Sequence, residues 1–189
     1  MVRAVGRRGA GAPPAETRHT LDGMTRSLGG ALTPALVDRF SQRDIAGRLG
    51  IALPFVTVDP DGRPHPMLLS YLELRAYDTG TIGLVIGVRS RSSRNLGERG
   101  TGTLLAIEPD ATVYVKLRAV DGPLPVAGSG EYELGYFLLA VEEVLEDAPA
   151  DWEGSMRITG GIRYAPAPTL DEPWARATLA ALAEPRARA

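Results

Sequence analysis

Apolar and polar residues alternate with a period of two through the middle of the chain, which is the pattern of β-strands. In residues 112–120, apolar side chains alternate with polar ones, so one face of the expected strand is apolar. Other apolar, β-prone runs are separated by short turns rich in Pro, Asp and Gly, which favours hairpins. The pattern predicts strands over residues 51–58, 65–74, 81–88, 103–108, 112–120 and 156–164.

Three segments have features of helices instead. A threonine stands before a proline and apolar residues follow on one stripe, which predicts a helix over residues 33–49. Residues 170–184 carry one apolar side and predict a second helix. Ser92 or Ser93 can cap a third, short helix that ends at Arg99.

These elements favour a mainly β fold with flanking helices. Many short strands with few helices are typical of a barrel or sandwich. Residues 132–147 are ambiguous, because their apolar residues also satisfy a helical period, and the pattern leaves both structures open. Residues 1–28 have no hydrophobic period and are rich in Gly, Ala, Pro and Arg, so we expect a disordered tail before one domain over residues 29–189.

Composition excludes several classes of function. The chain has no cysteine, which rules out disulfides, thiolate metal sites and cysteine nucleophiles and predicts a cytoplasmic protein. Two histidines cannot build a multi-histidine metal centre, and no metal site is expected. The net charge of −2 gives no basis for a nucleic-acid partner. No apolar stretch approaches the roughly 20 residues that span a bilayer, so no membrane partner is expected.

Residues 84–96 are chemically the most informative segment. A buried strand opens there into a run of serines and arginines, residues 90–95, followed by a short helix. Free N–H groups at a helix start favour a phosphate, serine hydroxyls donate to its oxygens, and an arginine can bind it through two hydrogen bonds. The segment therefore indicates an anion site, although a solvated basic turn explains the local pattern equally well.

The order of motifs around this segment resembles a known family. The turn Asp-Gly-Arg-Pro-His-Pro of residues 61–66 precedes a strand, a Gly-containing turn, a third strand and Ser-Arg-x-x-x-Asn-Leu at residues 90–96. The chain is thus similar to the pyridoxamine 5′-phosphate oxidase-like superfamily over about residues 36–164, most specifically in residues 56–107. The resemblance implies a six-stranded antiparallel split β-barrel that forms a homodimer with FMN at the interface. It also makes residues 132–147 mainly a strand.

The resemblance further implies which residues bind FMN. The phosphate would meet the serines and arginines of residues 90–94, with Asn95 helping to fix the loop. The isoalloxazine ring would lie along residues 66–70, with Val88 and Arg89 near the ribityl chain. The implied cofactor-binding residues are Pro66, Met67, Leu68, Leu69, Ser70, Val88, Arg89, Ser90, Arg91, Ser92, Arg94 and Asn95.

Departures from the vitamin B6 oxidase argue for a different substrate. Pro66, Ser92 and residues 86–87 stand where that enzyme has Arg, Lys and Thr-Asn, so several phosphate and ribityl donors are missing. Its late Arg-x-His pair has no counterpart here either. We therefore expect a divergent FMN-dependent oxidoreductase that acts on another small molecule. A non-catalytic flavin, deazaflavin or haem-binding protein on the same fold is the alternative, and an empty structural dimer is a third possibility.

No catalytic residue is predicted with a defined role. His65 lies next to the expected flavin strand, where a proton-transfer role is conceivable. Prolines flank it on both sides, so a partly exposed residue at the start of a strand is the plainer explanation.

Overall fold

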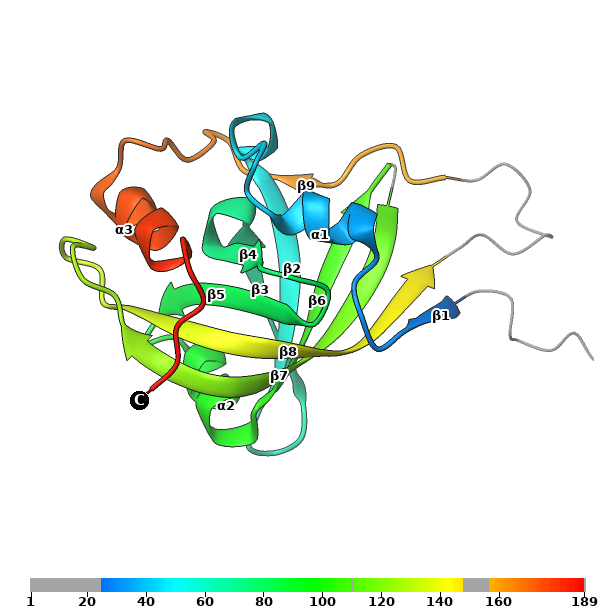
Figure 1. Cartoon of the computed structure of the whole chain (residues 1–189), viewed down its shortest axis with the longest axis horizontal. Coiled ribbons are helices and arrows are strands. Elements are labelled where there is room, and N and C mark those ends of the chain that lie inside the picture. The colour runs from blue at the N-terminus through cyan, green and yellow to red at the C-terminus, as the bar shows by residue number, and fades with distance from the viewer. Residues whose placement is uncertain (1–24, 110, 148–156, 189) are drawn as a thin grey trace, which may run out of the picture.

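Antiparallel β-strands build most of the molecule (Figure 1). The structure is a computed structural model that describes residues 25–109, 111–147 and 157–188. Its strands are β1 (Thr25–Gly29), β2 (Ile51–Val58), β3 (Pro64–Ser70), β4 (Leu74–Ala76), β5 (Thr81–Gly87), β6 (Thr101–Glu108), β7 (Ala111–Pro125), β8 (Leu134–Asp147) and β9 (Ile162–Arg163). The helices are α1 (Pro34–Phe40), α2 (Arg91–Arg99) and α3 (Pro173–Ala181), with 3₁₀ turns η2 (Ala46–Arg48) and η3 (Tyr71–Glu73). Within these described residues, no helix is long and apolar enough to cross a membrane.

All nine strands of the described residues belong to one sheet. Their order is β3-β2-β6-β7-β8-β5-β4, with β1 paired to β8 and β9 paired to β2. Six strands have seven or more residues, whereas β1, β4 and β9 have five or fewer. The mainly β fold is confirmed, but the expected count of six strands is not, because three short strands add to the six long ones.

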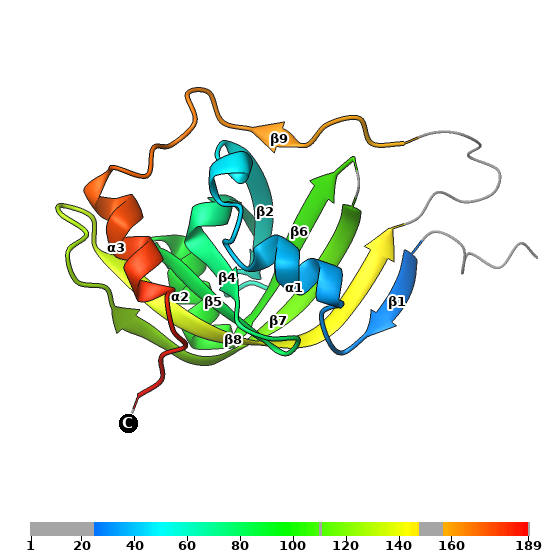
Figure 2. The same cartoon turned by 45° about the horizontal axis from the view of Figure 1, so that its top comes forward.

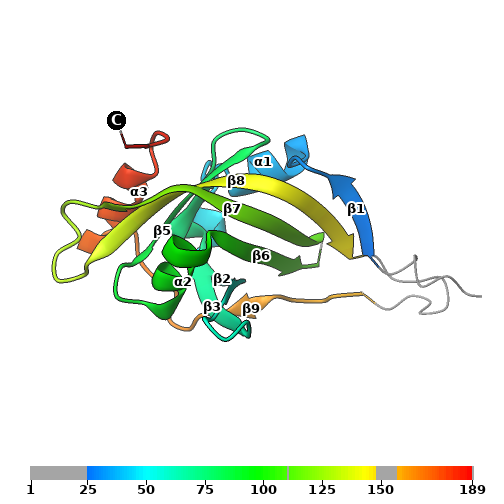
Figure 3. The same cartoon turned by 90° about the horizontal axis from the view of Figure 1, so that it is seen from below.

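The sheet curls so that its inner face encloses the main core. Figure 3 shows β6, β7 and β8 side by side as a curved layer, and Figure 2 shows α1 lying over these strands. Leu36 and Phe40 of α1 are buried in the same core as Phe55 of β2 and Phe137 of β8. Burial of such a side chain stabilises the fold by about 1.5–3 kcal/mol, so α1 and the sheet hold each other in place.

Pro54 marks the point at which β2 changes its neighbour. On one side, residues 52–58 of β2 pair with β3. On the other side, residues 55–57 pair with β6 and residues 51–52 pair with β9. Because proline has no N–H to donate to a neighbouring strand, neither ladder continues through this position.

α1 begins where the sequence predicts but is shorter than the expected helix over residues 33–49. The Thr33 hydroxyl accepts a hydrogen bond from the Leu36 amide, as an N-cap does. The helix ends at Phe40, and Gln42 has a positive φ of 64°. The Gln42 side-chain amide donates to the carbonyl of Leu72 at 3.1 Å, so a contact with η3 accompanies the break.

Other predicted boundaries also shift. Residues 1–24 of the expected tail lie outside the described residues, whereas 25–28 belong to β1, which pairs with β8. A capped 3₁₀ turn, η3, divides the strand expected over 65–74 into β3 and β4. Within the described part of 156–164, strand structure is confined to β9. The helix expected over 170–184 is present as the shorter α3.

The ambiguous segment is a strand, β8, as the family resemblance implies, and α3 packs on its outer face. Tyr136 of β8, Val85 of β5 and Leu182 after α3 belong to a second buried cluster, separate from the main core. The chain beyond α3 then crosses the sheet: the Arg186 amide donates to the Tyr136 hydroxyl at 3.1 Å, and its guanidinium donates to the Pro125 carbonyl at 3.2 Å. Both faces of β8 are therefore covered near its start.

Candidate functional site

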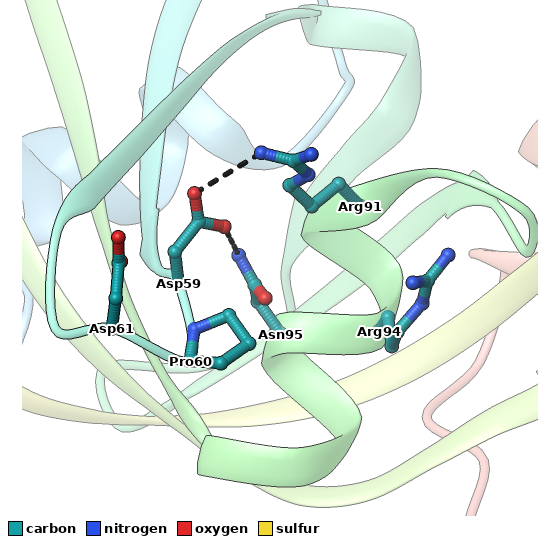
Figure 4. Close-up of a pocket in the computed structure, with 6 residues that line it drawn as sticks. All are labelled: Asp59, Pro60, Asp61, Arg91, Arg94 and Asn95. Carbon is teal, nitrogen blue, oxygen red and sulfur yellow. Dashed lines mark hydrogen bonds and ion pairs between the residues drawn. The ribbon is translucent and has the colours of Figure 1, made fainter.

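A cleft of about 350 Å³ lies between the β2–β3 turn and α2 (Figure 4). The turn is closed by the Asp59 amide, which donates to the Arg63 carbonyl at 2.8 Å, and by the Gly62 amide, which donates to the Asp59 carbonyl at 2.9 Å. Gly62 has a φ of +84°, a conformation that favours glycine. The cleft is lined by Asp59, Pro60, Asp61, Arg91, Arg94 and Asn95.

Ser90 caps α2, whereas the sequence analysis expects Ser92 or Ser93. The Ser90 hydroxyl accepts a hydrogen bond from the Ser93 amide at 3.0 Å. Ser92 and Ser93 are buried, at 1% and 3% exposure. The cap falls two or three residues earlier, because the chain is still extended at Ser90 and already helical at Arg91. The first amides of α2 have no acceptor inside the helix, which is the property of helix starts that favours anions.

Asn95 joins α2 to the β2–β3 hairpin. Its side-chain amide donates to the Thr57 hydroxyl at 3.1 Å and to the Asp59 carboxylate at 2.8 Å, and Asn95 is only 1% exposed. The hydrogen bond from Asn95, aided by the charge of Arg91, holds the pKa of Asp59 below its ordinary value. Asp59 is therefore a fixed negative charge in the cleft at neutral pH.

The two arginines of the cleft have different surroundings. Arg91 points toward Asp59, and its guanidinium lies 3.3 Å from the Asp59 carboxylate (Figure 4). Arg94 is exposed, points away from Asp59, and forms no ion pair with any residue that the structure describes. His65 approaches the same Asp59 oxygen, Oδ2, as Arg91 does, with Nδ1 3.7 Å away. Its side chain is 28% exposed, so His65 is a partly exposed residue near the start of β3.

β3 presents an open edge beside this cleft. Within the described residues it pairs with β2 alone. Because the Asp59 amide donates to the Arg63 carbonyl, the alternation of an antiparallel pair turns the backbone groups of Pro66 and Leu68 away from β2. Pro66 offers a carbonyl only, and Leu68 offers an N–H and a carbonyl. The Ser70 amide is occupied, since it donates to the Glu73 carboxylate at 2.6 Å.

The side chains of the expected flavin strand are divided between surface and core. Pro66 and Leu68 are exposed, and Met67 is half-buried. Leu69 and Ser70 are buried at 0% and 4% exposure. The apolar surface of this strand therefore comes from its first three residues.

Val88 and Arg89 lie at a separate hollow of about 540 Å³ by the β7–β8 hairpin. Val88 lines it together with Glu133 and apolar residues of the hairpin such as Leu124 and Tyr132. The Arg89 guanidinium forms two hydrogen bonds to the Glu133 carboxylate, at 2.7 and 2.8 Å. This pairing holds the pKa of Glu133 below its ordinary value, so the pair is charged at neutral pH.

Comparisons with known proteins give matches in structure and one in sequence. The fold is similar to a putative pyridoxamine 5′-phosphate oxidase from Lactobacillus delbrueckii, with 17% identity, a TM-score of 0.48, and coverage of 63% of this chain and 98% of that chain. An FMN-binding protein from Syntrophomonas wolfei matches with 14% identity, a TM-score of 0.45 and coverage of 58% and 85%. An F420 reductase matches with 14% identity, a TM-score of 0.41 and coverage of 51% and 90%. These neighbours are oxidase-like, FMN-binding and reductase proteins.

The sequence match is to the uncharacterized protein YclD of Bacillus subtilis strain 168. It is 32% identical over 104 residues, which are 54% of this chain and 66% of YclD, just under two thirds of that protein. No family model matches the chain.

The structure brings some of the predicted site residues together and separates others. Arg91, Arg94 and Asn95 line one cleft, whereas Arg89 is engaged with Glu133 at the hairpin hollow. Ser92 does not line the cleft. The acidic wall formed by the β2–β3 turn was not predicted, because Asp-Pro-Asp-Gly is also an ordinary turn sequence and carries no separate signal of a charged site.

Proposed function

We propose that this chain binds FMN and uses it as an oxidoreductase on a small organic substrate. The observation that carries the proposal is the cleft in which Arg91 and Arg94 stand beside the first turn of α2. Guanidinium groups and free helix amides are the usual donors to a phosphate monoester. The open edge of β3 lies on the adjoining hairpin, where a planar, polar ring edge would find backbone partners.

The residues present fit a phosphate, although with fewer donors than the resemblance implies. Arg91, Arg94 and the first amides of α2 would hold it, and the Ser90 hydroxyl is free to donate while its oxygen accepts from the Ser93 amide. Ser92 is buried and supplies no side-chain donor at the surface of the cleft. We therefore expect weaker FMN binding than in a site with a full set of serine and lysine donors.

The ring of the flavin would use the edge of β3. The Leu68 N–H can donate to a ring carbonyl, and the carbonyls of Pro66 and Leu68 can accept from the ring N–H. The exposed Leu68 side chain, at 44% exposure, offers apolar contact beside them. FMN would supply the electron-transfer chemistry when bound, while the chain would orient it and exclude water from one side.

A homodimer forms part of the proposal. An edge strand with an exposed apolar residue is a surface that proteins commonly cover. A second subunit over β3 would shield the ring and complete the site. Light scattering coupled to size-exclusion chromatography should then give about twice the 20.1 kDa chain mass, and a monomer would contradict this part of the proposal.

The decisive experiment is the visible absorption spectrum after loading with FMN and removing the excess. Flavin bands should remain with the wild type and disappear in the double variant Arg91→Ala, Arg94→Ala. The control variant Arg26→Ala, Arg43→Ala removes the same charge from two exposed ion pairs far from the cleft in sequence, and it should retain flavin. No retention by the wild type would contradict FMN as the cofactor and favour deazaflavin or haem.

Turnover separates an enzyme from a binding protein. If the loaded protein is an oxidoreductase, a nicotinamide or another electron donor should bleach the flavin bands, and oxygen or a substrate should restore them. Retained flavin that no donor reduces would support the non-catalytic alternative instead.

A further inference from the structure

We propose that Asp59 selects the ligand of the cleft by competing with it for Arg91, so that a phosphate monoester binds by displacing the Asp59 carboxylate from that guanidinium. This inference rests on the proposed binding of a phosphate group. It concerns which anions the cleft accepts, and it assigns a role to a residue that the sequence motif does not include.

The Asp59 carboxylate is held in place by one oxygen and offered to Arg91 by the other. Oδ1 accepts from the buried Asn95 at 2.8 Å, and Oδ2 lies 3.3 Å from Arg91. The carboxylate side chain is only 15% exposed, whereas the Arg91 side chain is 62% exposed. Arg91 is therefore the movable partner, and Asp59 stays in the cleft whether or not Arg91 turns to a ligand.

The strength of the pair sets the selectivity. An ion pair with one long contact and an exposed arginine contributes little in water, because solvent screens the charges. A phosphate monoester carries about two negative charges and three acceptor oxygens. Its attraction to the Arg91 guanidinium is therefore stronger than the attraction that Asp59 gives up. A carboxylate ligand carries the same single charge as Asp59, so it gains nothing by the exchange, although both ligands meet the repulsion of Asp59.

Arg94 gives the incoming anion a first contact. It lines the same cleft and forms no ion pair with a residue in the described part of the chain. An anion can therefore bind Arg94 before Arg91 leaves Asp59. A purely structural role for the Asp59–Arg91 pair predicts the opposite effect of removing Asp59, because Arg91 would lose its orientation and the anion would bind more weakly.

The test uses inorganic phosphate as the probe and isothermal titration as the readout, with acetate at equal ionic strength for comparison. Asp59→Asn keeps an oxygen for the hydrogen bond from Asn95 but loses the charge, and we expect phosphate to bind at least about threefold more tightly. Asp61→Asn is the matched control, because Asp61 lines the cleft but contacts the Arg63 amide and guanidinium and not Arg91. It should change phosphate affinity less than Asp59→Asn does.

Two further variants keep the result interpretable. Asp59→Glu keeps the charge and should bind phosphate no more tightly than the wild type. In an Arg91→Ala background, Asp59→Asn should lose most of its effect. Weaker or unchanged binding by Asp59→Asn, an equal gain in Asp61→Asn, or an undiminished gain without Arg91 would each overturn the proposal, as would an absence of phosphate binding in every variant.

Parallel titrations with FMN and riboflavin separate this inference from the proposed function. Asp59→Asn should tighten the binding of FMN but not that of riboflavin, which lacks the phosphate. An equal gain in affinity for both flavins would overturn the proposed competition. If neither flavin binds while phosphate binding still responds to Asp59→Asn, the FMN proposal fails and the role of Asp59 stands.

Discussion

At the scale of single residues, the polar contact that holds the candidate site together is the buried amide of Asn95. Asn95→Ala would leave the Thr57 hydroxyl and the Asp59 carboxylate without their shared donor. Because unsatisfied buried polar groups are costly, we expect a loss of about 1–3 kcal/mol in the free energy of unfolding, measured with urea. Arg94→Ala, at the adjacent and exposed position, should stay within about 0.5 kcal/mol of the wild type. Equal losses in the two variants would refute the bracing role of Asn95.

A second buried network, around Glu108, makes a prediction about alkaline pH. The Tyr71 hydroxyl and the Arg39 guanidinium both donate to the Glu108 carboxylate. Burial, together with the hydrogen bond to Glu108, raises the pKa of Tyr71 far above its usual value of 10.0. An unfolded tyrosine loses its proton near pH 10, whereas folded Tyr71 keeps it, so its contribution is complete below about pH 10 and is lost progressively above it.

Tyr71→Phe should therefore flatten the fall of stability above about pH 10. The variant should also lose roughly 1 kcal/mol at neutral pH, because Glu108 loses one donor. Urea unfolding at a series of pH values measures both effects. Tyr132→Phe is the control, since Tyr132 is 51% exposed. If the free energy of unfolding fell as steeply above about pH 10 in Tyr71→Phe as in the wild type, other groups would control that fall.

The candidate site was only partly predictable from individual residues. Arg91, Arg94 and Asn95 follow a buried strand and open a helix, a local arrangement that points to an anion. Asp59 lies more than 30 positions away in the chain, so no local pattern can reveal that it faces Arg91. Ser92 was expected to meet the phosphate because of the family resemblance, yet its position on α2 turns it toward the interior.

At the scale of elements, the start of α2 gives a direct test of the corrected cap. Ser90→Ala should destabilise the unliganded protein by about 1 kcal/mol, because the Ser93 amide loses its acceptor. Ser90→Asp should retain most of the stability, since a carboxylate caps as well and favours the helix dipole. Thermal unfolding compares the two variants with the wild type. A similar loss in both would contradict the assignment of Ser90 as the cap.

β8 explains why a strand can have the hydrophobic period of a helix. Phe137 and Val141 face the main core, but a register shift opposite residues 116–117 of β7 then moves the inward position to Val144. On the other face, Tyr136 and Leu138 pack in the second cluster. Because both faces are buried and the register shifts by one residue, apolar residues of β8 follow one another at intervals of three and four positions. Periodicity therefore cannot identify this strand without its neighbours.

Elements with simple surroundings were predictable. β2 has the boundaries expected from its apolar run, because a glycine precedes it and a Pro-Asp-Gly turn follows. α1 begins at its Thr-Pro signal, but neither glycine nor proline marks its end. The break at Gln42 instead involves a hydrogen bond to Leu72, a partner that the local sequence does not reveal.

At the scale of the whole molecule, the mainly β class follows from alternation and turns, whereas the strand order does not. β6 and β7 are neighbours in sequence and in the sheet, but β8 pairs with β5 across nearly 50 residues of chain. The second buried cluster, which lies under α3, depends on the same long-range arrangement. The stability of α3 is therefore a property of the folded sheet, because an isolated helix of nine residues is marginal in water.

A substitution at Leu182 can measure how far the stability of α3 depends on the sheet. It is fully buried after α3 and packs over Gly83 of β5, where an added Cβ would lie 2.9 Å from a Leu182 methyl group. Leu182→Ala leaves a cavity at the junction of α3 and the sheet and should cost about 2–5 kcal/mol. Leu68→Ala, in a 44% exposed leucine, should cost about 0.5 kcal/mol or less.

The manner of unfolding then shows whether α3 belongs to the same cooperative unit as the sheet. In a Trp152→Phe background, Trp174 on α3 is the single tryptophan, so its fluorescence follows the helix while far-ultraviolet circular dichroism follows the sheet. The two urea transitions should coincide, and Leu182→Ala should move both to lower urea concentration, because the second buried cluster couples β5 and β8 to α3. If fluorescence changed at a lower urea concentration than circular dichroism, α3 would unfold independently of the sheet. The second buried cluster would then stabilise the helix without stabilising the sheet.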